Sequence, residues 1–177
     1  MRAAWWIAGV VVCGALGTGA EARQPAPKKL KVKLLTSTGQ NAGIAIFRQE
    51  KDGVKLTLSL ERIPFGDHGV HLHQNPSCEA PDFKSAGPHF NPTGMHHGFK
   101  AEGGPHAGDL PHSIHIGEEQ NGSVSFLLKN VTMDPAAPNS IFANGGTSIV
   151  VHEKGDDQMT DPSGNSGNRI ACGVIKQ

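Results

Sequence analysis

Short runs in which apolar and polar residues alternate recur along this chain, and no segment shows a helical period with end caps. The clearest run is Val54–Leu60, which puts one apolar face and one polar face on an extended backbone. The runs cover residues 31–34, 44–47, 54–60, 69–73, 113–116, 123–129, 148–151 and 170–175. About eight short strands separated by turn residues predict an all-β antiparallel sandwich or barrel.

Two long irregular stretches, residues 74–111 and 153–169, interrupt this rhythm. Loops of that length without secondary structure are uncommon in a compact domain and are usually functional. Nearly all the candidate metal ligands of the chain lie in these stretches or beside them. We therefore expect both loops to be functional.

Residues 1–22 have the features of a secretory signal peptide. Arg2 precedes an apolar run that ends in small residues with an A-x-A cleavage motif, and the run is too short to span a membrane as a mature helix. Cleavage before Cys13 would instead produce a lipoprotein, but Val12 is bulky where a small residue is expected. We therefore expect export with removal of residues 1–22.

The remainder of the 177-residue chain is sufficient for one domain with a real core. We expect residues 23–29 to form a short flexible leader and residues 30–177 to form that domain. Lys and Arg number 16, as do Asp and Glu, so the chain has no net charge. This balance favours neither a nucleic acid nor a membrane surface as a partner of the mature chain.

Export leaves two cysteines, Cys78 and Cys172, in an oxidising compartment. A single intramolecular disulfide is then the default expectation. The alternative is a pair of unlinked buried thiols.

A dense set of metal-ligand residues lies between Gly69 and Asp109. His71 and His73 alternate in an extended run, so both rings leave one face of a strand. Imidazoles suit copper or zinc, and the set is too rich in nitrogen for calcium or magnesium. The set comprises His71, His73, His89, His97, His106 and Asp109. It exceeds what one tetrahedral ion needs, so it predicts a centre with two metal ions.

Ordered runs along the chain give it a close resemblance to a known family. They are HGVHLH at 68–73, SAGPHFNP at 85–92, HAGDL at 106–110, VHEKGDD at 151–157 and GNRIACGVI at 167–175. The chain resembles the copper/zinc superoxide dismutase family over nearly its whole mature length, in the bacterial periplasmic branch. The resemblance implies an eight-stranded Greek-key β-barrel or sandwich located in the periplasm.

The resemblance also implies one copper and one zinc ion per subunit, with a role for each matching residue. Copper would be held by His71, His73, His89 and His152, and zinc by His89, His97, His106 and Asp109. His89 would bridge the two ions while the copper is alternately reduced and reoxidised, which dismutates superoxide to oxygen and hydrogen peroxide. Arg169 would hold the anion beside the copper, Asp156 would hydrogen-bond one ligand of each ion, and Cys78 would pair with Cys172.

Several positions remain less sharply assigned. His68 matches a structural position that bonds the backbone, and Ser163 falls where a hydroxyl narrows the substrate channel. Family spacing favours His97 over the adjacent His96, and surface or packing roles are favoured over metal binding for His112 and His115. Residues 153–168 lack the charged steering pair of the eukaryotic branch at matching positions, and only Lys154 supplies a cation there. Lys84 and Lys100 in the other long loop are therefore the candidates for steering superoxide.

Two other classes of protein compete with this interpretation. A non-catalytic copper- or zinc-binding module on the same fold would typically lack a copper ligand or the channel arginine, and this chain has both. A dinuclear zinc hydrolase would need a centre rich in carboxylates, whereas imidazoles dominate here. The sequence leaves open whether the subunit is a monomer or a homodimer.

Overall fold

The structure is a computed structural model, and it describes residue 1 and residues 27–177. The predicted signal peptide, including Cys13, and most of the predicted leader therefore lie outside the described residues, apart from residue 1. Among the described residues, no helix is long and apolar enough to cross a membrane.

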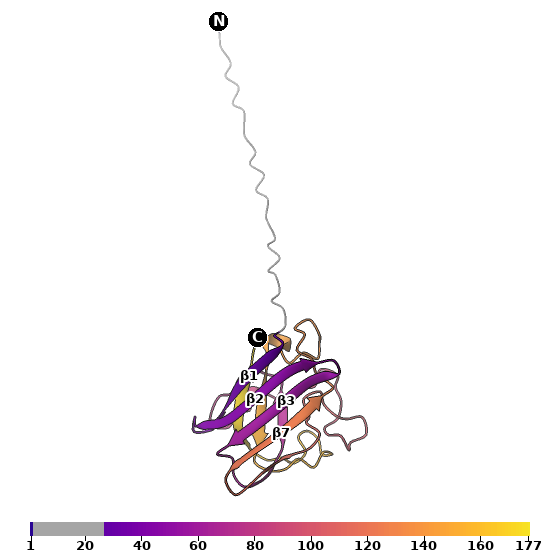
Figure 1. Ribbon diagram of the computed structural model, residues 1–177. Coiled ribbons are helices and arrows are strands. Elements are labelled where there is room, and N and C mark those ends of the chain that lie inside the picture. The colour runs from indigo at the N-terminus through magenta and orange to yellow at the C-terminus, as the bar shows by residue number, and fades with distance from the viewer. Residues whose placement is uncertain (2–26) are drawn as a thin grey trace.

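The described residues form nine β-strands and only two short 3-10 helices, which confirms the all-β prediction (Figure 1). Each run of alternating residues lies in a strand or overlaps one. The strands are β1 (Lys29–Thr36), β2 (Asn41–Glu50), β3 (Gly53–Glu61), β4 (Gly66–His68), β5 (Val70–His73), β6 (Ile114–Ile116), β7 (Asn121–Leu128), β8 (Thr147–His152) and β9 (Arg169–Ile175). The helices are η1 (Lys84–Ala86) and η2 (Ala143–Gly145).

The strands pair antiparallel in a seven-stranded sheet of order β5-β8-β9-β1-β2-β3-β7 and a two-stranded sheet, β4-β6. Figure 1 shows β1, β2, β3 and β7 across the front, with the later strands of the large sheet behind them. The large sheet therefore curls into two layers. The chain passes from β7 at one edge to β8 next to the other, a long connection of the kind that Greek-key sandwiches use.

The one departure in strand number lies at Gly69, where the sequence predicted a single run over 69–73. The structure ends β4 before Gly69 and begins β5 after it, with β4 paired to β6 and β5 paired to β8. Gly69 accepts a hydrogen bond from His152 N–H at 2.9 Å and donates one to Lys154 O at 2.7 Å. The chain thus changes sheets at this residue, and a β4 of only three residues was too short to recognise.

The core lies between the two layers and is built from aliphatic and phenylalanine side chains. In β3 the apolar face of the Val54–Leu60 run is fully buried, as the alternation predicted. Phe47 of the neighbouring β2 has no exposed surface. Burial of side chains of this size contributes about 1.5–3 kcal/mol each, so the sheet gives the loops a rigid base.

A disulfide anchors the first long loop to the sheet. Cys78 is bonded to Cys172 of β9, with a Cα–Cα distance of 5.7 Å, so the predicted pairing is confirmed. Cys172 packs in a small buried cluster with Phe83, Ala86 and Val150. The alternative of two unlinked thiols is wrong.

Candidate metal centre

The centre is built on the edge strand β5. His71 and His73 lie in β5, and β5 pairs with β8, which ends at His152. The sheet thereby brings together histidines that are far apart in the sequence. The rings of His71 and His152 lie 4.8 Å apart, and Nε2 of His73 is 3.4 Å from Nε2 of His152.

The first long loop folds back along β5 through backbone hydrogen bonds. Phe90 N–H donates to Leu72 O, Leu72 N–H donates to Gly108 O, and Gly108 N–H donates to Phe90 O, each at 2.8 Å. A Cβ at Gly108 would collide with the Leu72 carbonyl oxygen, so this close approach requires glycine. The neighbouring residues His89 and Asp109 are consequently placed against His73 and His71.

Two overlapping groups of buried ligand atoms result. In each group the candidate ligand atoms all lie within 4.8 Å of one another. The first group is His71, His73, His89 and His152, and the second is His71, His89, His97 and Asp109. His106 adjoins the second group, with its Nδ1 3.4 Å from His89 Nδ1 and 3.3 Å from Asp109 Oδ1. All the predicted ligands therefore meet in one place.

The ring nitrogens that point away from this place are held by hydrogen bonds. His73 Nδ1 donates to Gly87 O at 2.8 Å, and His152 Nδ1 donates to Gly167 O at 3.2 Å. His71 Nε2 donates to Asp156 Oδ2 at 2.8 Å. Outer-shell acceptors of this kind fix the tautomer of a metal-binding histidine, which leaves the inner nitrogen with a free lone pair.

Inner nitrogens of three histidines are buried and form no well-directed hydrogen bond. Nδ1 of His71 and Nε2 of His89 have no partner in the described chain, and Nδ1 of His97 has only the carboxylate of Asp109 beside it, 3.2 Å from Oδ1. An unpaired polar atom in the interior is unfavourable unless another group satisfies it. Nitrogen donors converging from several rings are the set that copper and zinc prefer, so the residues present fit both ions.

The electrostatics differ between the two groups. Burial, with mutual repulsion among the rings, lowers the pKa of His73 and His152 well below the ordinary value and that of His89 to about 3. Burial alone would also lower the pKa of His97, but the adjoining carboxylates of Asp109 and Asp156 raise it to about 9. The first group is therefore a set of neutral imidazoles, whereas carboxylates dominate the field at the second.

Asp156 joins the two groups. Its Oδ2 accepts from His71 Nε2 at 2.8 Å, and its Oδ1 accepts from His97 Nε2 at 3.0 Å. Burial would raise the pKa of Asp156, but the hydrogen bonds from His71 and His97 hold it well below its usual range. The carboxylate is therefore ionised and orients one ring of each group.

Arg169 lies at the start of β9 and is held by the first loop. Its Nη1 donates to Phe83 O and its Nη2 donates to Gly87 O, both at 2.7 Å. Because Gly87 O also accepts from His73, one carbonyl ties the guanidinium to a candidate metal ligand. Partial burial lowers the pKa of Arg169 from its ordinary value.

A surface cavity of about 430 Å³ adjoins this arginine, and its lining includes Lys84 as well as Arg169. Lys84 is highly exposed and forms an ion pair with Asp82 at 3.0 Å. Lys100 and Ser163, two other candidates for the substrate path, are not among the residues that line this cavity.

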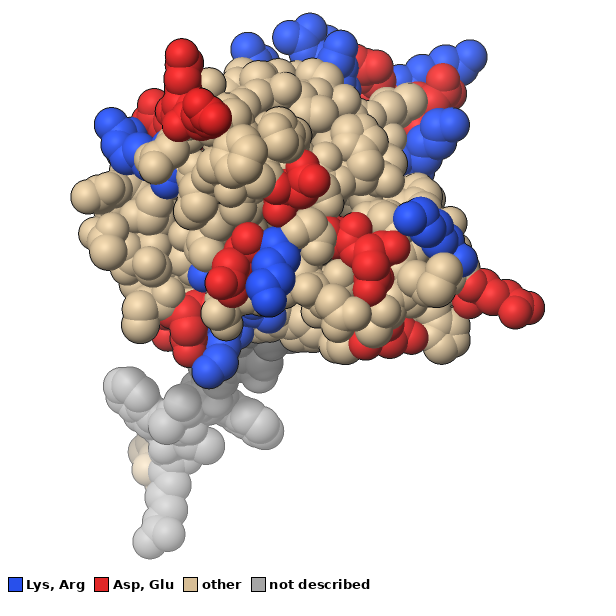
Figure 2. Space-filling model, turned by 90° about the horizontal axis from the view of Figure 1, so that it is seen from below, with Lys and Arg blue, Asp and Glu red and all other residues tan. Residues whose placement is uncertain are grey.

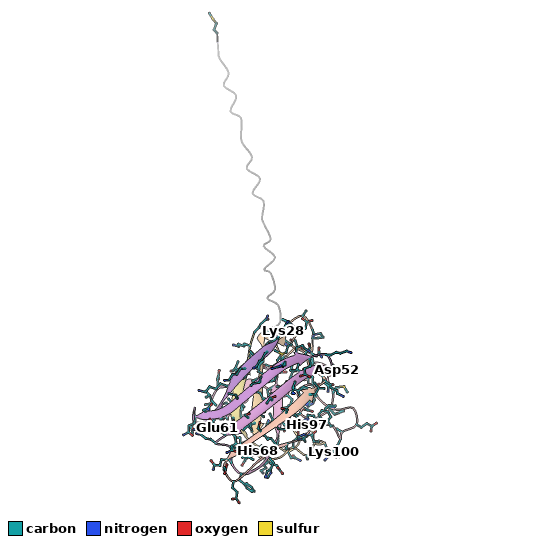
Figure 3. All side chains as sticks on the ribbon, viewed as in Figure 1. Lys28, Asp52, Glu61, His68, His97 and Lys100 are labelled. Carbon is teal, nitrogen blue, oxygen red and sulfur yellow. A yellow bond between two sulfur atoms is a disulfide. The ribbon has the colours of Figure 1, made fainter. Side chains whose placement is uncertain are left out.

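The remaining histidines lie in different surroundings. His68 is buried, with Nδ1 2.8 Å from His152 O and Nε2 2.8 Å from Pro64 O. His97 has a fully buried side chain, whereas that of the adjacent His96 is 66% exposed and contacts Asp161. Figure 3 shows His68 and His97 at the end of the molecule opposite Lys28. The exposed His115 pairs with Asp67, and His112 packs against Phe126.

Sequence reasoning missed Gln158, which contacts Asp156. A glutamine in a polar loop carries no signal in a single sequence, and its burial is visible only in the folded protein. The backbone carbonyls that hold Arg169 could not be assigned either, because every residue supplies one.

The fold and this site define a two-layer β-protein with a histidine-rich centre for two adjoining metal ions. The family model of copper/zinc superoxide dismutase (SODC) matches residues 41–175. The chain therefore belongs to the copper/zinc superoxide dismutase family.

Individual relatives agree with this assignment. The chain is 40% identical over 149 residues to superoxide dismutase [Cu-Zn] 1 of Aquifex aeolicus, covering 84% of this chain and 88% of that protein. It is 35% identical over 162 residues to superoxide dismutase [Cu-Zn] of Deinococcus radiodurans, covering 83% and 84%.

Solved structures are similar as well. A SOD-like protein from Bacillus subtilis superposes with a TM-score of 0.78 at 33% identity, covering 82% of this chain and 97% of that one. The Cu/Zn superoxide dismutase from Brucella abortus superposes with a TM-score of 0.67 at 28% identity, covering 84% and 99%.

The predicted function is confirmed at this level. The protein is an enzyme that dismutates superoxide to oxygen and hydrogen peroxide, with copper and zinc as cofactors. The competing interpretation as a non-catalytic metal-binding module is not favoured by these relatives.

Proposed function

We propose that the two ions divide the ligands as follows: copper takes His71, His73, His89 and His152, and zinc takes His89, His97, His106 and Asp109. The position of His89 is the observation that carries the proposal. Its Nε2 is buried without a hydrogen-bond partner, and its Nδ1 lies 2.9 Å from Asp109 Oδ1. His89 belongs to both ligand groups, so one ring with a free nitrogen on one side and Asp109 on the other can serve two ions.

His71 lies close to both groups, and its hydrogen bond decides its place. Asp156 occupies Nε2 of His71, so only Nδ1 remains, and one nitrogen serves one ion. The outer nitrogens of His73 and His152 bond backbone carbonyls, and with His89 these rings form a set of imidazoles alone. Nδ1 of His71 is the fourth imidazole nitrogen of that set, so we assign His71 to copper. His106, whose Nδ1 lies beside His89 Nδ1 and Asp109, completes a closed tetrahedral zinc set.

When bound, copper supplies the one-electron chemistry of the dismutation. The chain's own residues hold the substrate and move the proton. Arg169 presents a guanidinium that binds the anion, and the Phe83 and Gly87 carbonyls fix its direction. His89, whose Nε2 is buried without a hydrogen-bond partner in the described chain, would hold the proton that the reduced oxygen species takes up. Asp156 positions the rings of His71 and His97, and His68 holds the backbone of His152 through its carbonyl oxygen.

Metal analysis of two neighbouring variants tests the ligand assignment. His97→Ala should lose zinc, and His96→Ala, the matched control from the adjacent exposed position, should keep a full complement of both ions. His152→Ala should lose copper and superoxide dismutation while retaining zinc. Loss of zinc from His96→Ala with retention in His97→Ala would overturn the assignment.

We infer further that residues 1–22 direct export and are removed, that 23–29 form a leader, and that residues 30–177 act in the periplasm. The disulfide between Cys78 and Cys172 supports an oxidising compartment. Mass spectrometry of the mature protein from the periplasmic fraction tests the cleavage site. Retention of residues 1–22, or a lipid on Cys13, would contradict it.

We propose that the mature enzyme needs neither a nucleic acid nor a membrane as partner. On the face shown in Figure 2, basic and acidic side chains are interspersed rather than gathered by sign. Co-sedimentation with anionic vesicles should leave the mature protein in the supernatant. Sedimentation velocity of the metal-loaded protein distinguishes a monomer from a homodimer.

A further inference from the structure

Gln158 occupies an unusual position beside the metal centre. It follows Asp156 by two residues in the loop between β8 and β9 and is only 5% exposed. Its φ of 64° places it in the left-handed region, which is unfavourable for a residue with a Cβ. Such a conformation persists only where the surroundings impose it.

Gln158 supplies half of the hydrogen bonds to the Asp156 carboxylate. Its backbone N–H donates to Oδ1, and its side-chain Nε2 donates to Oδ2, both at 2.7 Å. His97 Nε2 and His71 Nε2 supply the other two, one on each oxygen. Each carboxylate oxygen therefore accepts one hydrogen bond from a histidine and one from Gln158.

Gln158 also joins the two long loops. Its Nε2 donates to Leu110 O at 3.2 Å, its Oε1 accepts from Phe99 N–H at 3.4 Å, and its own carbonyl accepts from Lys100 N–H at 2.9 Å. A Cβ at Gly98 would collide with the Gln158 carbonyl group. These contacts hold Gln158 in place independently of its hydrogen bonds with Asp156.

We propose that Gln158 is a positioning residue for both metal ions, acting through Asp156. Two histidine donors alone would permit the carboxylate to turn, because each ring can follow an oxygen. The two additional donors from Gln158 match only one orientation of the carboxylate. That orientation directs Nδ1 of His71 inward, where it is buried without a hydrogen-bond partner in the described chain, and directs the buried Nδ1 of His97 toward Asp109, 3.2 Å from Oδ1.

This inference rests on the proposed division of ligands, because it requires His71 and His97 to serve different ions. It therefore predicts that one substitution at Gln158 disturbs both metal sites. A residue that merely braces the loop would instead alter stability without changing the geometry at the copper.

Gln158→Met tests the proposal, because methionine keeps the length of the side chain and removes both of its polar groups. The backbone donor stays in place. Asn165→Leu is the matched control: Asn165 lies in the same loop, also has a positive φ, and donates its side-chain amide to Asp157 Oδ2 at 2.9 Å. The readouts are the visible and electron paramagnetic resonance spectra of Cu(II) and the zinc affinity in competition with a chelator.

We expect Gln158→Met to shift the Cu(II) spectra and to weaken zinc binding about 10–100-fold, the usual effect of losing an outer-shell partner. Asn165→Leu should match the wild type in both. Wild-type spectra and zinc affinity in Gln158→Met would overturn the proposal, whatever its thermal stability.

If Gln158→Met does not fold, Gln158→Glu is the second variant: it keeps the shape and the acceptor for Phe99 N–H, and it replaces the donor to Asp156 Oδ2 by an oxygen that the carboxylate repels. Altered spectra and weakened zinc binding in Gln158→Glu support the proposal, and unaltered ones overturn it. Failure of the ligand assignment itself would appear separately, as wild-type protein that does not bind one copper and one zinc.

Discussion

Removal of the disulfide should substantially destabilise the metal-free protein. Cys78 and Cys172 are separated by 94 positions in the sequence, so the bond closes a long loop. In the chain-entropy model a loop of this length restricts the unfolded chain by about 4.7 kcal/mol at 25 °C. A domain of this size has a total stability of about 5–15 kcal/mol, so the bond accounts for a large share of it.

The assay is reversible urea unfolding of metal-free wild type and of the double variant Cys78→Ala with Cys172→Ala. The free energy of unfolding should fall by about 4–5 kcal/mol, and the melting temperature by about 10–20 °C for a domain of this length. Cys172 packs against Phe83 and Val150, so loss of its sulfur adds a small packing defect in the same direction. Metal must be removed first, because bound ions stabilise the folded state independently.

Reduction by a phosphine provides the control for this prediction. It should destabilise the wild type by a similar amount and leave the double variant unchanged. A difference below about 1 kcal/mol between oxidised and reduced wild type would refute the entropic reasoning, since it would mean that the unfolded chain is already confined. An effect of reduction on the double variant would show that the reagent acts elsewhere.

Three further predictions concern charge. Arg169→Ala should lower the rate of dismutation near neutral pH by about 10-fold or more, the typical effect of losing a charge-assisted contact, with copper and zinc content intact; an unchanged rate would exclude the docking role. Lys84→Glu should slow the reaction at low salt and flatten its dependence on ionic strength, whereas Lys100→Glu, outside the cavity beside Arg169, should do so much less. The metal-free protein should lose stability as pH falls from 6.5 toward 3. Burial holds the pKa of His89 at about 3 in the folded protein, against 6.5 in the unfolded chain, so the unfolded chain binds more protons over this range. Denaturant midpoints that rise as the pH falls would contradict this prediction. His97 acts in the opposite sense, and its contribution is lost as pH rises toward 9.

The sequence determined the strands and the nature of the site. Alternation over residues 54–60 fixed which face of β3 is buried, because side chains on a strand point to opposite sides in turn. The same rule placed His71 and His73 together, and their chemistry restricted the metals to copper or zinc. Ordered motifs then indicated the family and, through it, the distant residues His152 and Arg169.

Only the tertiary structure decided how these residues act together. His152 reaches His73 because β8 pairs with β5, and no local pattern specifies which strands pair. The carbonyls of Phe83 and Gly87 orient Arg169, yet backbone acceptors are present at every position and become specific only in a folded loop. Gln158 gives the sharpest case. Its residue type is ordinary for a surface loop, and its burial and its hydrogen bonds with Leu110 and Lys100 exist only because two loops distant in sequence pack together.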